Sequence, residues 1–463
     1  MAHEVKISLF SGIDPFGTAI SSVVDTTTTS YYLESINLQT PITERIVETM
    51  VVRVKGSSLA DMRTKLAAIY YAADIVRQFE NGESDQFVRV QLQVLNTGNT
   101  YWSQIHAMDI EISPNLLKID VAGTETSVTI TYERDGYWEA SGLVTTITIT
   151  NPNGSGTLLG IANCNDNSGT APNKLINYVD IDTSDVDGDL PTPLYIQVNN
   201  IENVSTGHKR IYAGGLGAQG TAYLPTTLFF EAESATSLGG SNVSDASCSG
   251  GYKKTIPISA DGENNLLEWT INDPNYFYGH WYKIIARFDD VSSLGNVKFR
   301  WQLWSGTTVV WEGPQFLLEN ATNLIQEMGE IPLPLSFNWN GSIKVRLIGE
   351  RTTSVTETLN LDYIQLMAAH TAIKAVGLNS LEHSETVYLP FQNSFPHKRA
   401  VRYTSSKNLN DWYMEWNRAV YINPVQYYRL HFGVQSETGG TAEIDRNSAI
   451  ACMYRPRYRA IGE

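Results

Sequence analysis

One stretch, residues 57–80, constrains the fold of this chain most, because it is the only long segment with a clear helical pattern. Its apolar residues recur at alternating spacings of three and four, which places them on one stripe of an amphipathic helix. Ser58 precedes the stripe and Asp61 follows three residues later, a weak form of the capping box. Asn81-Gly82 supplies the end, since both residues tolerate the left-handed conformation. The sequence therefore predicts one helix that packs on a sheet through Leu59, Met62, Leu66, Ile69, Ala73 and Val76.

The segments on either side of this helix carry the alternating apolar pattern of β-strands. Strands are predicted within residues 3–56, at 86–95, at 102–112 and at 128–132. The composition agrees, because 35 Gly, 24 Tyr and 10 Trp in 463 residues favour strands and turns. We therefore expect a mainly β fold, in which the first unit runs from strands through one helix to further strands.

The first unit closes on residues 131–140, with the sequence TYERDGYWEA. Its order of strand, helix and strands, followed by an acidic-basic turn into Gly-Tyr-Trp-Glu, resembles the N-terminal domain of phage distal tail proteins. That family shares its fold with tail-tube proteins, a β-sandwich flanked by one helix, and assembles as rings. The resemblance implies a ring of copies, a hexamer or a trimer. Tyr137 and Trp138 are then predicted to fill the end of the sandwich, with contact between ring neighbours as the alternative.

Length and composition favour roughly three domains of ~150 residues each. We predict a tail-type domain at 1–140, a jelly-roll β-sandwich at 141–370 and a β-rich segment at 371–463. A formal net charge of −16 argues against a nucleic-acid-binding surface. Three cysteines far apart, Cys164, Cys248 and Cys452, form no disulfide framework, so folding in a reducing cytosol is the simpler expectation. We expect neither a signal peptide nor a membrane span.

Two runs in the middle of the chain match known motifs incompletely. Five aspartates crowd residues 178–193, a density that can hold Ca²⁺. An EF-hand alignment puts Leu194 where the bidentate Glu belongs, so a solvated acidic turn is favoured. The run GLGAQG at 215–220 matches a dinucleotide-binding fingerprint, but no helical stripe follows it. We therefore predict a flexible loop there.

Residues 229–367 hold the runs FFEAES, SCSGGYKKTIPI, HWYKIIARF and NLDYIQL in that order. This order resembles the jelly-roll carbohydrate-binding modules that open on an E-A-E strand and close on an L-D-Y-I-like strand. The resemblance implies a structural Ca²⁺ held by Glu231 or Glu233 and by Asp362. The alternative is that both glutamates face solvent and that Asp362 caps a turn or pairs with an arginine.

The same module is rich in aromatic residues, which can stack on sugar rings where they are exposed. Trp281 and Trp301 lie in strand patterns and are predicted to be core residues. Asn275, Tyr276 and Tyr278 precede a strand and are the better candidates for an open glycan site. The module can equally serve as a spacer, because the same sandwich fold does both.

The C-terminal residues place Arg455, Arg457 and Arg459 in an otherwise acidic chain. Such a segment can add to a neighbour's sheet edge or pair with acidic loops of an adjacent subunit. A solvated tail is the alternative.

No HExxH, GxSxG or Walker A motif is present, and the histidines lack metal-ligand spacing. We therefore predict a structural, non-catalytic protein of a phage tail or tail-like particle, located in the virion tail and assembled in the host cytoplasm. Its expected partners are copies of itself in a ring and other tail proteins. The alternative is an adhesin that contacts a host surface glycan through residues 229–367.

Overall fold

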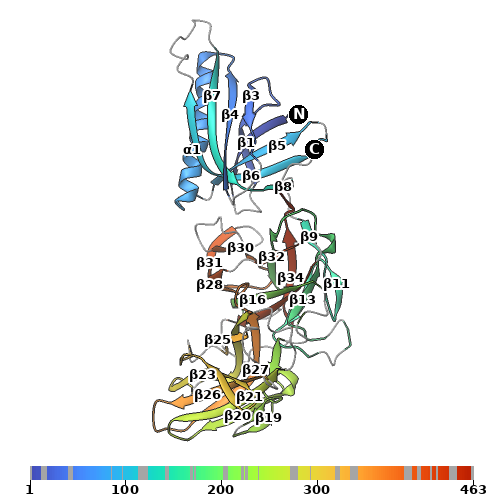
Figure 1. The fold of residues 1–463 in the computed structure, drawn as a ribbon, viewed down its shortest axis with the longest axis vertical. Helices are drawn as coiled ribbons and strands as arrows, with labels where there is room; N and C mark the ends of the chain where they lie inside the picture. Colours follow the sequence, from blue (N-terminus) through green and yellow to red (C-terminus); the bar gives the residue numbers. More distant parts are fainter. Residues whose placement is uncertain are drawn as a thin grey trace.

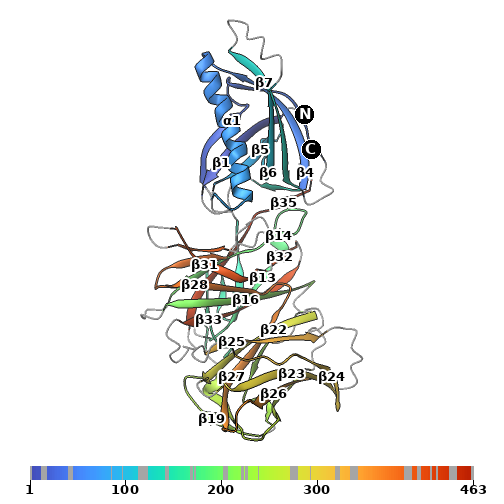
Figure 2. The same ribbon diagram turned by 90° about the vertical axis from the view of Figure 1, so that its left-hand side faces the viewer.

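The computed structural model describes residues 3–11, 18–39, 45–84, 86–95, 97–112, 124–140, 145–166, 170–171, 174–201, 207–219, 224, 228–237, 239–271, 280–291, 294–318, 324–333, 343–389, 399–403, 408–417, 420–423, 426–436 and 446–459. They form three tiers along the axis of an elongated molecule (Figure 1). The first tier holds the N-terminal strands and the long helix. The turned view shows the same order of tiers (Figure 2). The prediction of a mainly β fold is confirmed.

The N-terminal domain consists of two sheets that share one bent strand. The first residues of β6 pair with β5 and β8, and its later residues pair with β7. The strand path is β2-β1-β5-β6-β7-β4-β3, with β35 added on β8. Its elements are β1 (His3–Ser11), β2 (Thr18–Asp25), β3 (Tyr31–Asn37), β4 (Arg45–Lys55), α1 (Leu59–Glu80), β5 (Gln86–Val94), β6 (Thr100–Ile112), β7 (Glu125–Asp135), β8 (Trp138–Ala140) and β35 (Arg457–Tyr458).

Helix α1 begins and ends as its sequence predicts. The Ser58 hydroxyl accepts from the Asp61 amide at 3.2 Å, and the Asp61 carboxylate accepts from the Ser57 amide at 2.7 Å. At the other end Gly82 takes a φ of 75°, which lets its amide and the next one bond back into the last turn. The predicted stripe is correct at its centre but wrong at Leu59, which is exposed. The buried face is Met62, Ile69, Ala72, Ile75, Val76 and Phe79.

The middle domain is built from two segments that are far apart in the sequence. One 13-stranded sheet runs β11-β10-β13-β33-β16-β28-β31-β30-β29-β15-β34-β12, with β9 on β34. Strands from distant places in this order share one apolar cluster, so the sheet folds over on itself. Its strands are β9 (Thr145–Ile147), β10 (Ile149–Asn151), β11 (Gly154–Gly156), β12 (Leu159–Ala162), β13 (Tyr178–Asp182), β15 (Tyr195–Asn200), β16 (His208–Ala218), β28 (Ile373–Leu381), β29 (Thr386–Leu389), β30 (Arg399–Tyr403), β31 (Asn408–Asn417), β33 (Tyr427–Ser436) and β34 (Arg446–Tyr454), beside the pair β14 (Thr192–Pro193) and β32 (Tyr421–Ile422).

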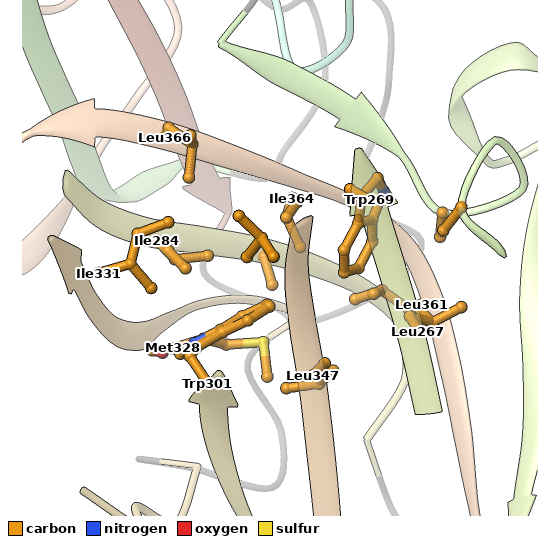
Figure 3. Packing of buried hydrophobic residues seen from close by; sticks show 14 of the residues in the cluster. Leu267, Trp269, Ile284, Trp301, Met328, Ile331, Leu347, Leu361, Ile364 and Leu366 are labelled. Carbon is orange, nitrogen blue, oxygen red and sulfur yellow. Dashed lines mark hydrogen bonds between the residues drawn. The ribbon is translucent and has the colours of Figure 1, made fainter. Parts of the chain in front are cut away.

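The third tier is a β-sandwich inserted between β16 and β28. One sheet runs β19-β20-β27-β22-β25, with β17 on β27, and the other runs β18-β21-β26-β23-β24. The core between them includes Trp301, whose indole N–H donates to the Met328 carbonyl at 2.5 Å (Figure 3). Its strands are β17 (Phe229–Glu231), β18 (Thr236–Ser237), β19 (Ser241–Ser244), β20 (Tyr252–Ile258), β21 (Glu263–Ile271), β22 (His280–Asp290), β23 (Val297–Ser305), β24 (Thr308–Glu312), β25 (Ile325–Leu333), β26 (Ile343–Arg351) and β27 (Glu357–Ala368).

This topology divides the chain differently from the sequence-based boundaries. The sequence predicts one jelly-roll domain at 141–370, which includes residues 145–218, and a separate segment at 371–463. In the structure β16 pairs with both β28 and β33, so these two stretches form one domain. The inserted sandwich is confined to residues 229–368, which begin and end beside each other where β17 pairs with β27. Strand pairing across more than 150 positions leaves no local signal, which is why the boundary was misplaced.

The glycine-rich run that was predicted to be a loop is a strand where the structure describes it. Gly215 to Ala218 belong to β16 and pair with β33. A Cβ on Gly217 would lie 2.3 Å from the Tyr428 ring, and one on Gly215 would lie 2.4 Å from the Leu430 side chain. The glycines are therefore explained by the close approach of the neighbouring strand, and the loop prediction is wrong for these residues.

The C-terminal return, residues 454–459, runs back from the middle domain to the N-terminal domain. It passes the aspartate-rich turn, where Gly188 has a φ of +110° and a Cβ would lie 2.7 Å from the Arg457 carbonyl oxygen. The Asp189 carboxylate accepts from the Arg459 amide at 2.7 Å. The return then forms β35 on β8, so this segment completes a sheet edge of its own chain.

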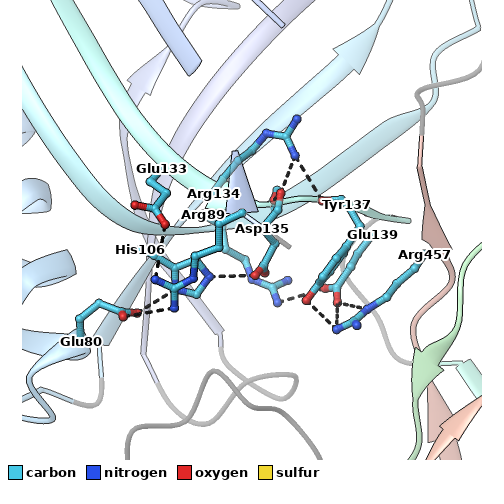
Figure 4. A network of polar contacts seen from close by, with 11 residues as sticks. Glu80, Arg89, His106, Glu133, Arg134, Asp135, Tyr137, Glu139 and Arg457 are labelled. Carbon is cyan, nitrogen blue, oxygen red and sulfur yellow. Dashed lines mark hydrogen bonds and ion pairs between the residues drawn. The ribbon is translucent and has the colours of Figure 1, made fainter. Parts of the chain in front are cut away.

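Buried charges fasten the C-terminal return to the N-terminal domain (Figure 4). Glu139 lies 3.1 Å from Arg455, 3.3 Å from Arg89 and 3.5 Å from Arg457. The Arg457 guanidinium also lies 3.7 Å from the centre of the Tyr137 ring. Arg455 and Arg457 are therefore buried within the chain, and neither forms a solvated tail. Tyr137 therefore contacts this return.

Candidate metal centre

The predicted metal-binding residues lie where the first and last strands of the inserted sandwich meet. Strand β17 pairs with β27, with Glu231 opposite Tyr363. The Ala232 amide donates to the Asp362 carbonyl at 2.8 Å. This pairing brings the side chains of Glu231, Glu233 and Asp362 to the same end of the sandwich, although more than 120 residues separate the two strands.

A turn at residues 249–251 lies against both glutamates. The Ser249 hydroxyl donates to Glu231 Oε1 at 2.5 Å. Gly250 has a φ of +63°, and a Cβ there would lie 2.8 Å from Glu233 Oε1 and 3.8 Å from Glu231 Oε1. Both carboxylates therefore converge on the Gly250 backbone. Their second oxygens, Oε2 of Glu231 and Oε2 of Glu233, are buried and accept no hydrogen bond within the described structure.

Asp362 is fully buried and has partners for both carboxylate oxygens. Oδ1 accepts from the Ser249 amide at 3.0 Å, and Oδ2 forms an ion pair with Arg287. Burial raises the pKa of Asp362 to about 7, although Arg287 acts in the opposite direction. Asp362 thus behaves as the alternative predicted, by pairing with an arginine, and it also holds the turn that faces the glutamates.

The charge on Glu231 is poorly compensated. Burial raises its pKa to about 8, the Ser249 hydroxyl lowers it, and the nearby Glu233, Asp362 and Asp166 raise it further. Burial also raises the pKa of Glu233. Like charges near a desolvated carboxylate disfavour its ionised form, and a cation relieves that repulsion.

These features fit a hard cation held between Glu231 and Glu233. Ca²⁺ prefers carboxylate and carbonyl oxygens and accepts irregular geometry. Two buried carboxylate oxygens without a donor supply such ligands. Bound there, the cation would supply positive charge that lets both carboxylates ionise. Sequence reasoning missed Ser249 and Gly250, although both lie in the SCSGGYKK run.

A second acidic group in the same sandwich is already neutralised. Within the described residues, Asp245, Cys248 and Asp289 each place one ligand atom within 4.8 Å of the others. Lys253 bridges the two aspartates, at 2.9 Å from Asp245 and with a shorter contact to Asp289. Burial raises the pKa of Cys248 to about 12, which keeps its thiol protonated. This group therefore has its own cation, unlike Glu231.

The aromatic residues predicted to be in the core or in a glycan site differ in how the structure places them. Asn275, Tyr276 and Tyr278 lie outside the described residues. Trp301 is buried as predicted, but the core assignment of Trp281 is wrong, because it is 45% exposed. Its ring meets the Trp311 ring edge to face at 6.3 Å. The alternation rule misplaced Trp281 because it lies next to the first residue of β22, where the sheet begins.

Comparisons with known proteins give only coarse likenesses. No family model matches the sequence, and no curated protein matches it. A chain of the phage p2 baseplate in its activated conformation with Sr aligns over 76% of this chain and 99% of its own, at 12% identity and a TM-score of 0.26. A chain of that baseplate with Ca aligns over the same shares, at 11% identity and a TM-score of 0.26. A chain of infectious bursal disease virus Gx strain aligns over 77% and 79%, at 10% identity and a TM-score of 0.15.

TM-scores this low do not establish a common fold, so none of these likenesses assigns the chain to a family. Within the described residues, no helix combines the length and the apolar character that crossing a bilayer requires.

Proposed function

We propose that this chain is a non-catalytic structural protein of a phage tail or tail-like particle, and that its N-terminal domain assembles as a ring. The observation that carries this proposal is the pair of edge strands in that domain. Within the described residues, β2 and β3 are the two ends of the strand path. Ile20 on β2 is 52% exposed and Tyr32 on β3 is 66% exposed.

Edge strands with free backbone groups and apolar side chains are templates for pairing with another chain. If β2 of one copy pairs with β3 of the next, the contact is heterologous, and a rotation that closes yields a ring. The resemblance to distal tail proteins supports this reading, and a hexamer or trimer is expected. In such a ring the middle domain and the sandwich would project away. Other tail proteins would be partners, and the virion tail, assembled in the host cytoplasm, would be the location.

The test is the assembly state of the full chain by mass photometry and negative-stain imaging. Wild type should form rings, and Ile20→Lys with Tyr32→Lys should be monomeric with an unchanged circular dichroism spectrum. Leu378→Lys, at an exposed position of the middle domain, is the matched control and should still assemble. A strictly monomeric wild type at high concentration would overturn the proposal.

A second candidate function is a glycan-binding adhesin, favoured by the exposed Trp281 beside Trp311. An exposed indole offers an apolar face on which a sugar ring can stack. A glycan array with the full chain tests it. Binding that is lost in Trp281→Ala and retained in Tyr70→Ala, an exposed aromatic on α1, would support the adhesin. Absence of binding to any glycan would leave the sandwich a spacer.

We further propose that Glu231 and Glu233 hold one structural Ca²⁺, with Asp362 fixing the Ser249 turn against it. The buried, unpartnered oxygens of the two glutamates support this site. Thermal melting of the full chain in Ca²⁺ and in chelator tests it. A melting temperature that is the same in both buffers would contradict the site.

A further inference from the structure

The C-terminal return is held by backbone hydrogen bonds from two domains at once. Its strand β35 pairs with β8 of the N-terminal domain, and the Ala140 amide donates to the Pro456 carbonyl at 3.0 Å. From the middle domain, the amides of Asp189 and Leu190 donate to the Arg457 carbonyl at 2.9 Å and 3.2 Å. Because Arg457 also belongs to β35, its backbone joins a strand of one domain to a turn of the other.

Side chains of the return contact the N-terminal domain as well. The Arg457 guanidinium lies on the Tyr137 ring and donates to the Tyr137 hydroxyl at 2.6 Å, next to its ion pair with Glu139 (Figure 4). The Tyr458 ring meets the Tyr101 ring edge to face at 5.8 Å, and it packs against the apolar core of that domain. This side of the contact therefore combines a buried charge network with an aromatic pair.

The middle domain holds the same return through its aspartate-rich turn. The Thr192 hydroxyl donates to the Arg455 carbonyl at 2.5 Å, and the Asp187 amide donates to the Tyr454 hydroxyl at 3.0 Å. Gly188 brings the turn so close that a Cβ there would lie 2.7 Å from a carbonyl oxygen of the return. The contact on this side therefore depends on backbone groups and on one glycine.

The apolar cores of the two domains are separate where the structure describes them. Among the described residues, the N-terminal core has Tyr458 as its sole member from beyond residue 140, and the core cluster of the middle domain has no member before residue 145. The sandwich differs, because its core includes Leu216 of the middle domain. Domains without a large apolar interface are expected to move relative to each other. The return is therefore the contact that can hold the N-terminal domain in one orientation.

We propose that the C-terminal return is a clasp that fixes the orientation of the N-terminal domain on the middle domain. The chain passes between the two domains a first time from β8, which ends at Ala140, to β9, which begins at Thr145. A second connection at β35 blocks rotation about this first one, and release of the return permits it. The inference does not depend on ring formation. In the proposed ring, the clasp would set the direction in which the middle domain and the sandwich project.

Distances between spin labels, measured by double electron–electron resonance on the full chain, test the clasp. One label pair joins Ala67→Cys on α1 to Leu378→Cys on the middle domain, and both positions are exposed. The native cysteines are buried, and the labelled chain is diluted with unlabelled chain so that distances within one chain are measured. The otherwise wild-type chain should give one narrow distance distribution.

Two changes open the clasp in different ways. Gly188→Val places a side chain against the return, and a chain that ends after Tyr454 lacks the return. Both should lose the narrow peak of the Ala67–Leu378 pair and give a broad distribution. Gly154→Val is the matched control, because Gly154 lies in the same domain and also has a positive φ, +139°, but a Cβ there would meet nothing within 4 Å. Its distribution should stay narrow.

A second label pair, Leu378→Cys with Val355→Cys on the sandwich, distinguishes the clasp from a general loss of structure. This pair should stay narrow in every variant, because the sandwich and the middle domain share buried clusters. A narrow Ala67–Leu378 distribution in the truncated chain, or a broad one in wild type, would overturn the clasp. Broadening of both pairs together would overturn it too, because the return would then support the whole fold rather than one orientation.

Discussion

Glu139 and Glu231 are both carboxylates near a boundary between domains, but their surroundings carry opposite charge. Burial alone would raise the pKa of Glu139, yet Arg455, Arg89 and Arg457 together hold it below its usual value. Glu231 has Glu233, Asp362 and Asp166 as its charged neighbours, and its pKa is raised to about 8. One site is thus neutralised by the chain itself, whereas at the other Lys254 acts on Glu233, Arg287 pairs with Asp362, and no cation is among the groups that shift the pKa of Glu231. This contrast is the main physical reason to expect a cation from solution at Glu231.

The largest expected effect comes from breaking the neutralised site. Glu139→Ala would leave three buried arginines without their shared anion, and such a loss typically costs about 3–5 kcal/mol. Chemical denaturation should show this decrease in the free energy of unfolding. Glu111→Ala, at an exposed position of the same domain, should change it little. A Glu139→Ala protein as stable as wild type would mean that the arginines do not depend on Glu139.

A pH dependence should come from His106, which belongs to the same charged region as Glu139 (Figure 4). Its ring nitrogens lie 2.8 Å from Glu80 and 2.8 Å from Asp135. Burial would lower the pKa of His106, but the two carboxylates raise it from 6.5 to about 9. A raised histidine pKa means that the stabilisation is complete below pH 6.5 and is lost as the pH rises through about 9.

The size of this effect is about 3 kcal/mol for a shift of this order. Urea denaturation between pH 6 and pH 10 should show the decline in wild type, and His106→Gln should flatten it over that window. Equal slopes in the two proteins would show that His106 is not protonated in the folded state.

A smaller effect, an increase in stability, is expected when the charges of Glu231 and Glu233 are removed. In chelator, at a pH above about 8 where Glu231 is ionised, Glu231→Gln with Glu233→Gln removes like charges that repel each other, so the melting temperature should rise, by an amount corresponding to about 1 kcal/mol. Glu139→Gln in the same buffer should lower it. If both changes destabilise the protein, the two sites do not differ in the way their charges indicate.

The sequence predicted contacts between residues that are close together in the chain better than contacts between residues that are far apart in it. Ser58, Asp61 and Gly82 act within one turn of α1, and their roles followed from local rules. The first and last strands of the sandwich were brought together by a resemblance that named Glu231, Glu233 and Asp362. Arg457 meets Glu139 across 318 positions, and no local pattern signals that contact.

The same limit explains the misplaced domain boundary and the missed role of the aspartate-rich turn. Strand pairing between β16 and β28 joins segments on either side of an inserted domain, and each segment alone reads as ordinary strand. The aspartates around Gly188 suggested a cation or a solvated turn, but the turn packs against the backbone of the C-terminal return. Both features are set by packing between segments that are distant in the sequence, and the composition of each segment does not predict that packing.

We expect a cation from solution to compensate the negative charge of the Glu231 carboxylate. Isothermal titration of the chelator-treated full chain with CaCl₂ tests it most directly. The account predicts one Ca²⁺ bound per chain in wild type and none in the Glu231→Gln, Glu233→Gln protein, while Asp245→Asn, at the acidic group already held by Lys253, should bind as wild type does. Wild type at a hundredfold excess of Ca²⁺ over its dissociation constant should gain ~2.7 kcal/mol of stability. No heat of binding in wild type, or equal binding in the double variant, would contradict the account.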